Sequence, residues 1–131
     1  MSLSAYKQTL KTTEPPRSME RRILNQLNAR LSLHQAAYDA TPEGGARLGI
    51  LAGGLREALH DNVSLWMEFK TDLSNPGNTL PAEMRANLLS LAIYVERQTG
   101  LVLKGQGTIK ALIDVNTPII EALQGQSTEV A

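Results

Sequence analysis

The sequence feature that most constrains the fold is an apolar stripe with helical spacing that runs through residues 46–73. At ~100° per residue, its members fall within a sector of less than ~90° around a helix. Four carboxylates lie on the opposite side of the same helix, aligned within ~60°. We therefore predict one long amphipathic helix with a buried face and an acidic outer face. The stripe consists of Leu48, Leu51, Leu55, Leu59, Trp66, Phe69 and Leu73, and the acidic face of Glu57, Asp61, Glu68 and Asp72.

Three further segments show the same helical spacing of apolar residues, over about residues 18–38, 81–104 and 109–123. Their stripes consist of Ile23, Leu24, Leu27, Leu31 and Tyr38 in the first, of Met84, Leu88, Leu91, Ala92, Val95 and Val102 in the second, and of Ile109, Leu112, Ile113, Ile120 and Leu123 in the third. Residues 4–12 can form a shorter helix at the N-terminus. No segment alternates between apolar and polar residues as a half-buried strand would. We therefore predict an all-α fold, a small bundle of four to five helices that is antiparallel or partly open.

Residues at the helix ends support these boundaries. Ser18 and Thr108 are side chains that cap helix N-termini, and Pro81 suits a first helical turn, where its missing N–H costs nothing. Within the last helix, Pro118 removes a donor to the carbonyl of Asp114, so we expect a kink or a restart there.

The length and composition match a single domain. A chain of 131 residues that is 42% apolar can bury roughly two-thirds of its unfolded surface. Aromatic residues make up only 4%, so aliphatic side chains must build the core. We assign residues 1–131 to one helical domain with an N-terminal arm over residues 1–16 and a frayed tail over residues 124–131.

The charge balance and the missing Cys exclude several classes of function. Lys plus Arg and Asp plus Glu number 13 each, and binding of nucleic acid requires a basic patch, so nucleic acid is disfavoured as a partner. The absence of Cys excludes disulfides and Cys-type zinc sites. The N-terminus lacks the apolar run of a signal peptide, and no stretch approaches the ~20 apolar residues of a membrane span. We expect a soluble, cytoplasmic protein without a membrane segment.

No pattern typical of catalysis or of cofactor binding stands out. His34 and His60 lack the spacing of metal-binding histidines, so we interpret them as rim or surface residues. Gly45, Gly49 and Gly53 recur at four-residue steps, but no strand precedes them and no Gly-Lys-Ser/Thr follows, which disfavours a phosphate loop. The acidic face lies opposite the core and is expected to be solvated, with a recognition surface for a basic segment as the alternative. We expect no enzyme activity, no metal and no cofactor.

Two amides lie inside apolar stripes. Asn62 stands between Leu59 and Trp66, and Asn116 stands inside the stripe of the last helix. A buried amide without a hydrogen bond costs ~1–3 kcal/mol, so each Asn is expected to bond the backbone of a neighbouring helix. The alternative is that they shape a groove that receives a partner helix. Trp66 is interpreted as a core residue, with an interface anchor as the alternative.

The segment "SNPGN" at residues 74–78 is predicted to be a joint between two helices. Asp72 comes just before it, near a helix C-terminus, where the helix dipole disfavours an anion. Lys70 or Arg85 is expected to compensate that charge.

These residues together resemble a known family. The chain is similar to the flagellar biosynthesis regulator FlaF of alphaproteobacteria over about residues 5–123, and the order and spacing of the motifs carry the resemblance. The segment "TPEGGARLGILAGG" is richer in Gly than the family pattern, so its loop and helix start can differ. The matching positions are Asn62, Leu65, Trp66, Asp72, Asn78, Leu80, Pro81, Arg85, Ala86, Leu112, Ile113 and Asn116, with Tyr6, Arg17 and Glu20 near the N-terminus.

The resemblance implies a non-enzymatic regulator of flagellin synthesis and flagellum assembly. It implies binding of flagellin as a chaperone or secretion adaptor, and a functional counterpart, FlbT, which acts on flagellin messenger RNA. The alternative is a post-transcriptional regulator that contacts this RNA or FlbT. Contact with RNA would require Arg17, Arg21, Arg22 and Arg30 to form one patch with an exposed Tyr or Trp.

The sequence also suggests where flagellin would bind. Flagellin's terminal segments become amphipathic helices, and recognition of a helix in an apolar groove would suit them. Surplus apolar positions in a soluble protein mark the candidate surface. These positions are Leu89, Ile93 and Tyr94 together with Tyr6 and Leu10.

Overall fold

The computed structural model describes the backbone of residues 16–130 and the side chains of residues 20–122. Within this part of the chain the regular elements are all helical, which confirms the predicted all-α fold. The expected helix over residues 4–12 and the expected arm lie outside the described side chains. The elements are α2 (Pro16–Ala40), η1 (Gly45–Arg47), α3 (Leu48–Ile50), η2 (Leu51–Leu55), α4 (Arg56–Leu73), α5 (Ala82–Leu103) and α6 (Ile109–Val130).

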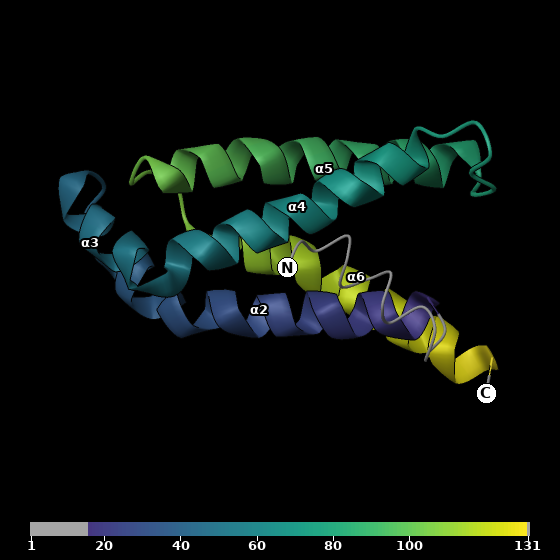
Figure 1. The fold of residues 1–131 in the computed structure, drawn as a ribbon, viewed down its shortest axis with the longest axis horizontal. Coiled ribbons are helices and arrows are strands. Elements are labelled where there is room, and N and C mark those ends of the chain that lie inside the picture. Colours follow the sequence, from purple (N-terminus) through teal and green to yellow (C-terminus); the bar gives the residue numbers. More distant parts are fainter. Residues whose placement is uncertain (1–15, 131) are drawn as a thin grey trace.

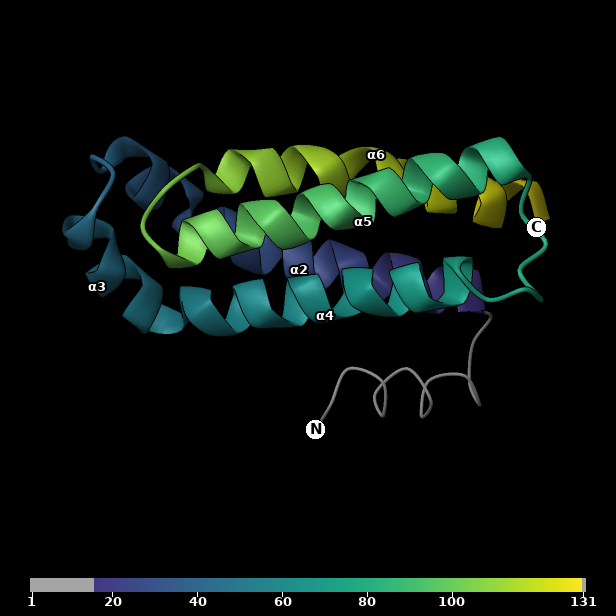
Figure 2. The same ribbon diagram turned by 90° about the horizontal axis from the view of Figure 1, so that it is seen from above.

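The four long helices form an antiparallel bundle in which each helix runs opposite to the one before it (Figures 1 and 2). Helix α2 packs closely against α6, and α4 packs closely against α5. Contacts between α2 and α4 and between α5 and α6 close the bundle. As a result, the start of α2, the 74–81 turn and the C-terminal part of α6 lie at one end, and α3 lies at the other.

The core is largely aliphatic, as the composition predicts. Leu24, Leu31, Leu51, Leu55 and Leu59 are fully buried and come from the predicted stripes. The only Trp and Tyr38 are the two largest buried side chains. None of the helices in the described part of the chain is both long and apolar enough to cross a membrane.

The predicted single helix over residues 46–73 is wrong, because the chain bends at two glycines. Gly53 leaves helical geometry with φ −89° and ψ 30°, and Gly54 has φ 102°, a conformation that L side chains rarely adopt. Helix α4 therefore begins at Arg56, and the preceding turns point away from its axis. This bend leaves Leu48 46% exposed, although the periodicity places it in the stripe.

Other differences from the predicted helices are small. Helix α2 begins at Pro16, two residues before Ser18, and Pro81 immediately precedes α5 as its N-cap. The Thr108 hydroxyl accepts a hydrogen bond from the N–H of Ala111 at 3.3 Å, as expected of an N-cap. Helix α6 continues through Pro118 without a restart to Val130, so it includes the backbone of residues expected to form a tail.

The α5 stripe also departs from the prediction at its first turn. Met84 is 47% exposed, because it lies ahead of the part of α5 that packs on the core. Further along, Ala92, Val95 and Val102 are buried as expected, and Thr99, which was not predicted, is buried among them. The Thr99 hydroxyl donates to the carbonyl of Val95 at 2.6 Å, which satisfies its polar group inside the core.

Candidate functional site

A network of buried amides crosses the middle of the bundle. The indole N–H of Trp66 donates to Asn116 Oδ1 at 2.8 Å, and Asn116 Nδ2 donates to Asn62 Oδ1 at 2.9 Å. The same Nδ2 reaches Asn28 Oδ1 at 3.3 Å, and Asn28 Nδ2 donates to the Thr117 hydroxyl at 3.4 Å. The network therefore joins α2, α4 and α6 through side chains alone.

Trp66 sets the direction of this network. An indole N–H can only donate, so Asn116 must turn its oxygen to Trp66 and its nitrogen to Asn62. Asn62 then uses its oxygen, and its buried Nδ2 has no hydrogen-bond partner among the described residues. The predicted bonds to a neighbouring backbone are wrong, because the two amides lie close enough to bond each other. The interpretation of Trp66 as a core residue is confirmed, with 1% of its surface exposed.

The turn between α4 and α5 is held by Asn78. Its Nδ2 donates to the backbone carbonyl and to Oδ2 of Asp72, both at 3.3 Å, and its Oδ1 accepts from the N–H of Leu80 at 3.0 Å. The expected compensation of Asp72 by Lys70 or Arg85 is wrong. Lys70 lies 3.9 Å from Glu96, and Arg85 reaches the backbone carbonyl of Asn78 at 3.5 Å.

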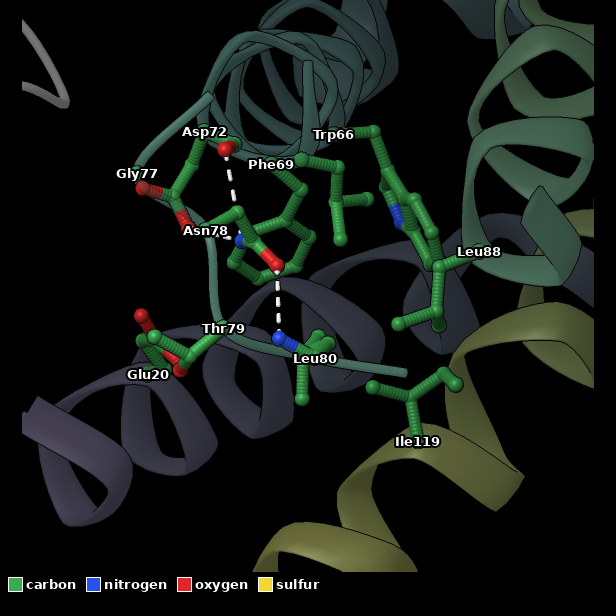
Figure 3. Close-up of a pocket in the computed structure, with 11 residues that line it drawn as sticks. Glu20, Trp66, Phe69, Asp72, Gly77, Asn78, Thr79, Leu80, Leu88 and Ile119 are labelled. Carbon is green, nitrogen blue, oxygen red and sulfur yellow. Dashed lines mark hydrogen bonds between the residues drawn. The ribbon is translucent and has the colours of Figure 1, made fainter. Parts of the chain in front are cut away.

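This turn borders a pocket of about 380 Å³ at the end of the bundle away from α3. We call this end the open end. In Figure 3 the polar side chains of Glu20, Asp72 and Asn78 lie on one side of the pocket. Trp66 and Leu88 lie on the other side. The pocket volume is at the lower end of the ~300–1,000 Å³ range of ligand clefts.

The apolar side of the pocket is built by four different parts of the chain. Trp66 and Phe69 of α4 meet edge to face with ring centroids 5.5 Å apart, Leu80 comes from the turn, Leu88 from α5 and Ile119 from α6. Trp66 is held in place from behind by its bond to Asn116, so the amide network fixes one wall of the pocket. Sequence reasoning identified the motif residues here but did not place Leu80, Leu88 and Ile119 together.

The opposite end of the bundle is closed by Arg47, which is only 3% exposed. Its guanidinium donates to the carbonyl oxygens of Thr41 at 2.8 Å, Gly107 at 2.7 Å, Gly105 at 3.3 Å and Asp39 at 3.5 Å. No sequence pattern predicted this buried charge. The Gly-containing breaks near residues 44 and 105 are the signal that could have indicated it, since an antiparallel bundle brings them to the same end.

Two side chains of α2 complete this closed end. The Tyr38 ring lies 4.3 Å from the Arg47 guanidinium carbon, and its hydroxyl donates to the Val102 carbonyl at 2.6 Å. Burial raises the pKa of the Tyr38 hydroxyl, and the nearby charge of Arg47 partly offsets that rise. The Asp39 carboxylate accepts from the N–H of Ile109 at 2.8 Å and so caps the start of α6.

The residues of the binding surface predicted on α5 do not all line one groove. Tyr94 is 44% exposed and lines a shallow groove with Val115 of α6, whereas Leu89 and Ile93 do not line that groove. Ile93 is 39% exposed and Leu89 is half-buried. Tyr6 and Leu10 lie outside the described residues. These five positions therefore stay a prediction, with Tyr94 on a separate part of the α5 surface.

The remaining polar candidates lie at the surface. Asp61 of the acidic face pairs with Arg30 of α2 at 2.8 Å, and Glu57 is exposed. His60 has 77% of its side chain exposed and His34 is half-buried. Within residues 20–122, no group of three or more potential metal ligands gathers.

The fold and the pocket define a small antiparallel helical bundle with an open recess at one end. The family model described as flagellar protein FlaF matches residues 2–123, so the chain belongs to the FlaF family of flagellar proteins. This confirms the resemblance noted in the sequence. No curated protein and no solved structure matches the chain significantly.

Proposed function

We propose that this protein is a non-enzymatic regulator of flagellin synthesis and flagellum assembly that binds flagellin as a chaperone or secretion adaptor. The pocket at the open end of the bundle is the observation that carries this proposal. It combines an apolar wall from three helices and a turn with a polar rim, which is the arrangement that anchors a side chain of a protein partner. Membership of the FlaF family supports a partner from the flagellar system.

The family motif supports the pocket as the binding site. Trp66 and Asp72 line the pocket directly, and Asn78 forms part of its rim. Asn116 holds Trp66 from behind, and Arg85 reaches the carbonyl of Asn78. These five of the positions that match the family thus build or support one recess.

A protein partner is favoured over RNA by the state of the arginines on α2. Arg30 is paired with Asp61 at 2.8 Å, and Nε of Arg21 is buried. A patch that binds phosphates needs guanidinium groups directed outward beside an exposed aromatic ring. Trp66, the only Trp, is buried, and the exposed Tyr94 lies on α5 and not on α2 with these arginines.

Calorimetric titration of the purified protein with monomeric flagellin tests the proposal. We expect measurable heat and co-elution, and a loss of affinity of at least about tenfold in the pocket variant Leu80→Ser/Leu88→Ser, since buried apolar anchors dominate protein interfaces. Leu89→Asp/Ile93→Asp tests the α5 surface in the same titration. Leu33→Ser changes a side chain that is 80% exposed and serves as the matched control.

The outcomes separate the alternatives. Absence of heat and of co-elution with flagellin would overturn the proposed function. Loss of affinity only in Leu89→Asp/Ile93→Asp would move the binding site to α5. Heat with FlbT alone, or a salt-dependent gel shift of the flagellin messenger RNA leader, would favour the post-transcriptional alternative.

A further inference from the structure

The polar side of the pocket carries an exposed carboxylate, that of Asp72. Asp72 is exposed in the last turn of α4, where the partial negative charge of the helix C-terminus adds to that of its carboxylate. The Glu20 carboxylate of α2 lies on the same side of the pocket (Figure 3). The pocket therefore has a side that favours a cation.

The neighbouring cations of the described residues do not pair with Asp72. Lys70 lies beside Glu96 at 3.9 Å, and Arg85 contacts the Asn78 carbonyl at 3.5 Å. Within the described part of the chain, Asp72 accepts hydrogen bonds from Asn78 and forms no ion pair. The amide of Asn78 holds the Asp72 carboxylate in position without neutralising it.

The apolar side of the pocket favours an apolar group of the ligand and not a cation. Phe69, Leu80, Leu88 and Ile119 are half-buried, and each presents apolar surface to the recess. A large aliphatic or aromatic side chain that covered these residues would be stabilised by burial of its apolar surface, whereas a charged group placed there would lose its hydration. The two sides of the pocket thus require an apolar group and a cation a short distance apart.

We propose that the pocket recognises a helical segment of its protein partner that carries a large apolar side chain and, one turn away, a Lys or Arg. The apolar side chain enters between Trp66, Leu80 and Leu88, and the cation reaches Asp72. Residues three or four apart on a helix lie on the same face, so one helical turn presents both groups together. This inference rests on the proposed function, in which flagellin is the partner, and specifies the type of segment that binds.

Fluorescein-labelled peptides of 20 residues that tile the flagellin chain are the probe. Anisotropy with the full-length protein ranks them, and the emission of Trp66, the only Trp, reports whether an unlabelled peptide occupies the pocket. We expect the tightest peptide to combine a large apolar residue with Lys or Arg three or four positions away. Replacing that cation by Gln should weaken binding by about threefold to tenfold, and added salt should reduce the difference.

A double-mutant cycle assigns the cation to its carboxylate. Asp72→Asn keeps an oxygen for Asn78 and removes the charge, so it should weaken the basic peptide by about threefold to tenfold. The peptide's Lys→Gln or Arg→Gln change should have almost no further effect in that background. Glu57→Gln removes a carboxylate from the exposed first turn of α4 and should leave the affinity unchanged.

Three results would overturn the inference. The first is that the affinity of the tightest peptides changes neither when their basic residue is replaced nor when the protein carries Asp72→Asn. The second is calorimetric binding of flagellin while no peptide changes the Trp66 emission, which would leave the proposed function intact and place the contact elsewhere. The third is a shift of Trp66 emission caused by Tyr6→Ser/Leu10→Ser without any peptide, which would assign the pocket to the chain's own N-terminal segment.

Discussion

At the end of the bundle near α3, Arg47 donates to four backbone carbonyls from a buried position, whereas at the other end Asp72 lies exposed beside an open pocket. Both ends use polar side chains to fix a turn between helices. At the closed end, these side chains point inward and fill the space between the turns. At the open end, Asn78 stays within its own turn and leaves a recess between Leu80 and Leu88. The comparison teaches that hydrogen bonds close one end of the bundle, whereas the other end keeps an open pocket, where we propose that binding occurs.

The closed end depends on close contact of two loops. Gly44 donates its N–H to the carbonyl of Gly105 at 3.0 Å, and both glycines have positive φ. Glu43 accepts from the N–H of Gly107 at 2.9 Å and adds a second bond between the loops. Disruption here should therefore lower the free energy of unfolding, and disruption at the open end should lower affinity.

The largest effect is expected from Arg47→Met. Removing the guanidinium of this buried residue removes four hydrogen bonds to backbone carbonyls, and the loss in free energy of unfolding should be roughly 3–5 kcal/mol. Urea denaturation followed by circular dichroism measures this loss. Arg56→Met removes the same group at an exposed position of α4 and should change stability by less than about 0.5 kcal/mol. Equal effects of the two variants would remove the distinction between the ends.

Asn116→Ala should come next, with a loss of roughly 3 kcal/mol. The change leaves the Trp66 N–H and Asn62 Oδ1 buried without partners, at a cost of about 1–3 kcal/mol each. Asn87→Ala, at an exposed position of α5, is the control and should be neutral or slightly stabilising. Because Asn116 supports the pocket wall, its change should also shift the Trp66 emission, and an unchanged spectrum would contradict that role.

Gly105→Ala should lower the free energy of unfolding by about 2 kcal/mol. Gly105 has φ 82°, and an added Cβ would lie 2.6 Å from the Gly44 carbonyl oxygen. Gly49→Ala is the matched control, because nothing lies within 4 Å of a Cβ there and Ala favours the helix by ~1 kcal/mol. Thermal unfolding of both variants should give changes of opposite sign. An unchanged free energy of unfolding in Gly105→Ala would show that the loops containing Gly44 and Gly105 can move apart without loss of stability.

Tyr38→Phe should cost about 1 kcal/mol at neutral pH through the lost hydrogen bond to Val102. The clearer effect of this variant is on how stability depends on pH above neutrality. The folded pKa of Tyr38 lies above its ordinary value of 10.0, so its contribution is full below about pH 10 and is lost as the pH rises through the folded pKa. Urea midpoints between pH 9 and pH 11 should decline less in Tyr38→Phe than in the exposed control Tyr94→Phe. Identical slopes would contradict the burial of this hydroxyl.

The smallest effect on stability is expected at the open end. Leu80→Ser keeps the backbone bond to Asn78 and changes a half-buried side chain, so the free energy of unfolding should fall by less than about 1 kcal/mol. Its affinity for flagellin should nevertheless fall by several-fold or more, which sharpens the contrast with Arg47→Met. A large loss of stability with unchanged affinity would assign Leu80 to the core.

The sequence alone predicted the helices well, because helical periodicity is a local property. The buried faces of Leu24, Leu31 and Leu59 followed from the ~3.6-residue repeat, as did the all-α fold. Boundaries failed where backbone conformation overrode periodicity, as at Gly53 and Gly54, where the expected helix bends. Periodicity indicates which face of a helix is apolar and does not reveal a positive φ at a single glycine.

The sequence by itself thus determined the all-α fold, the buried position of Trp66 and the interruption between α4 and α5. Only the tertiary structure decided that Asn62 and Asn116 bond each other, that Arg47 closes one end, and that Leu80 and Leu88 share a pocket. The physical reason is that these contacts join residues 6 to 60 positions apart in the sequence. Their positions depend on how whole helices pack, and no local spacing encodes that packing.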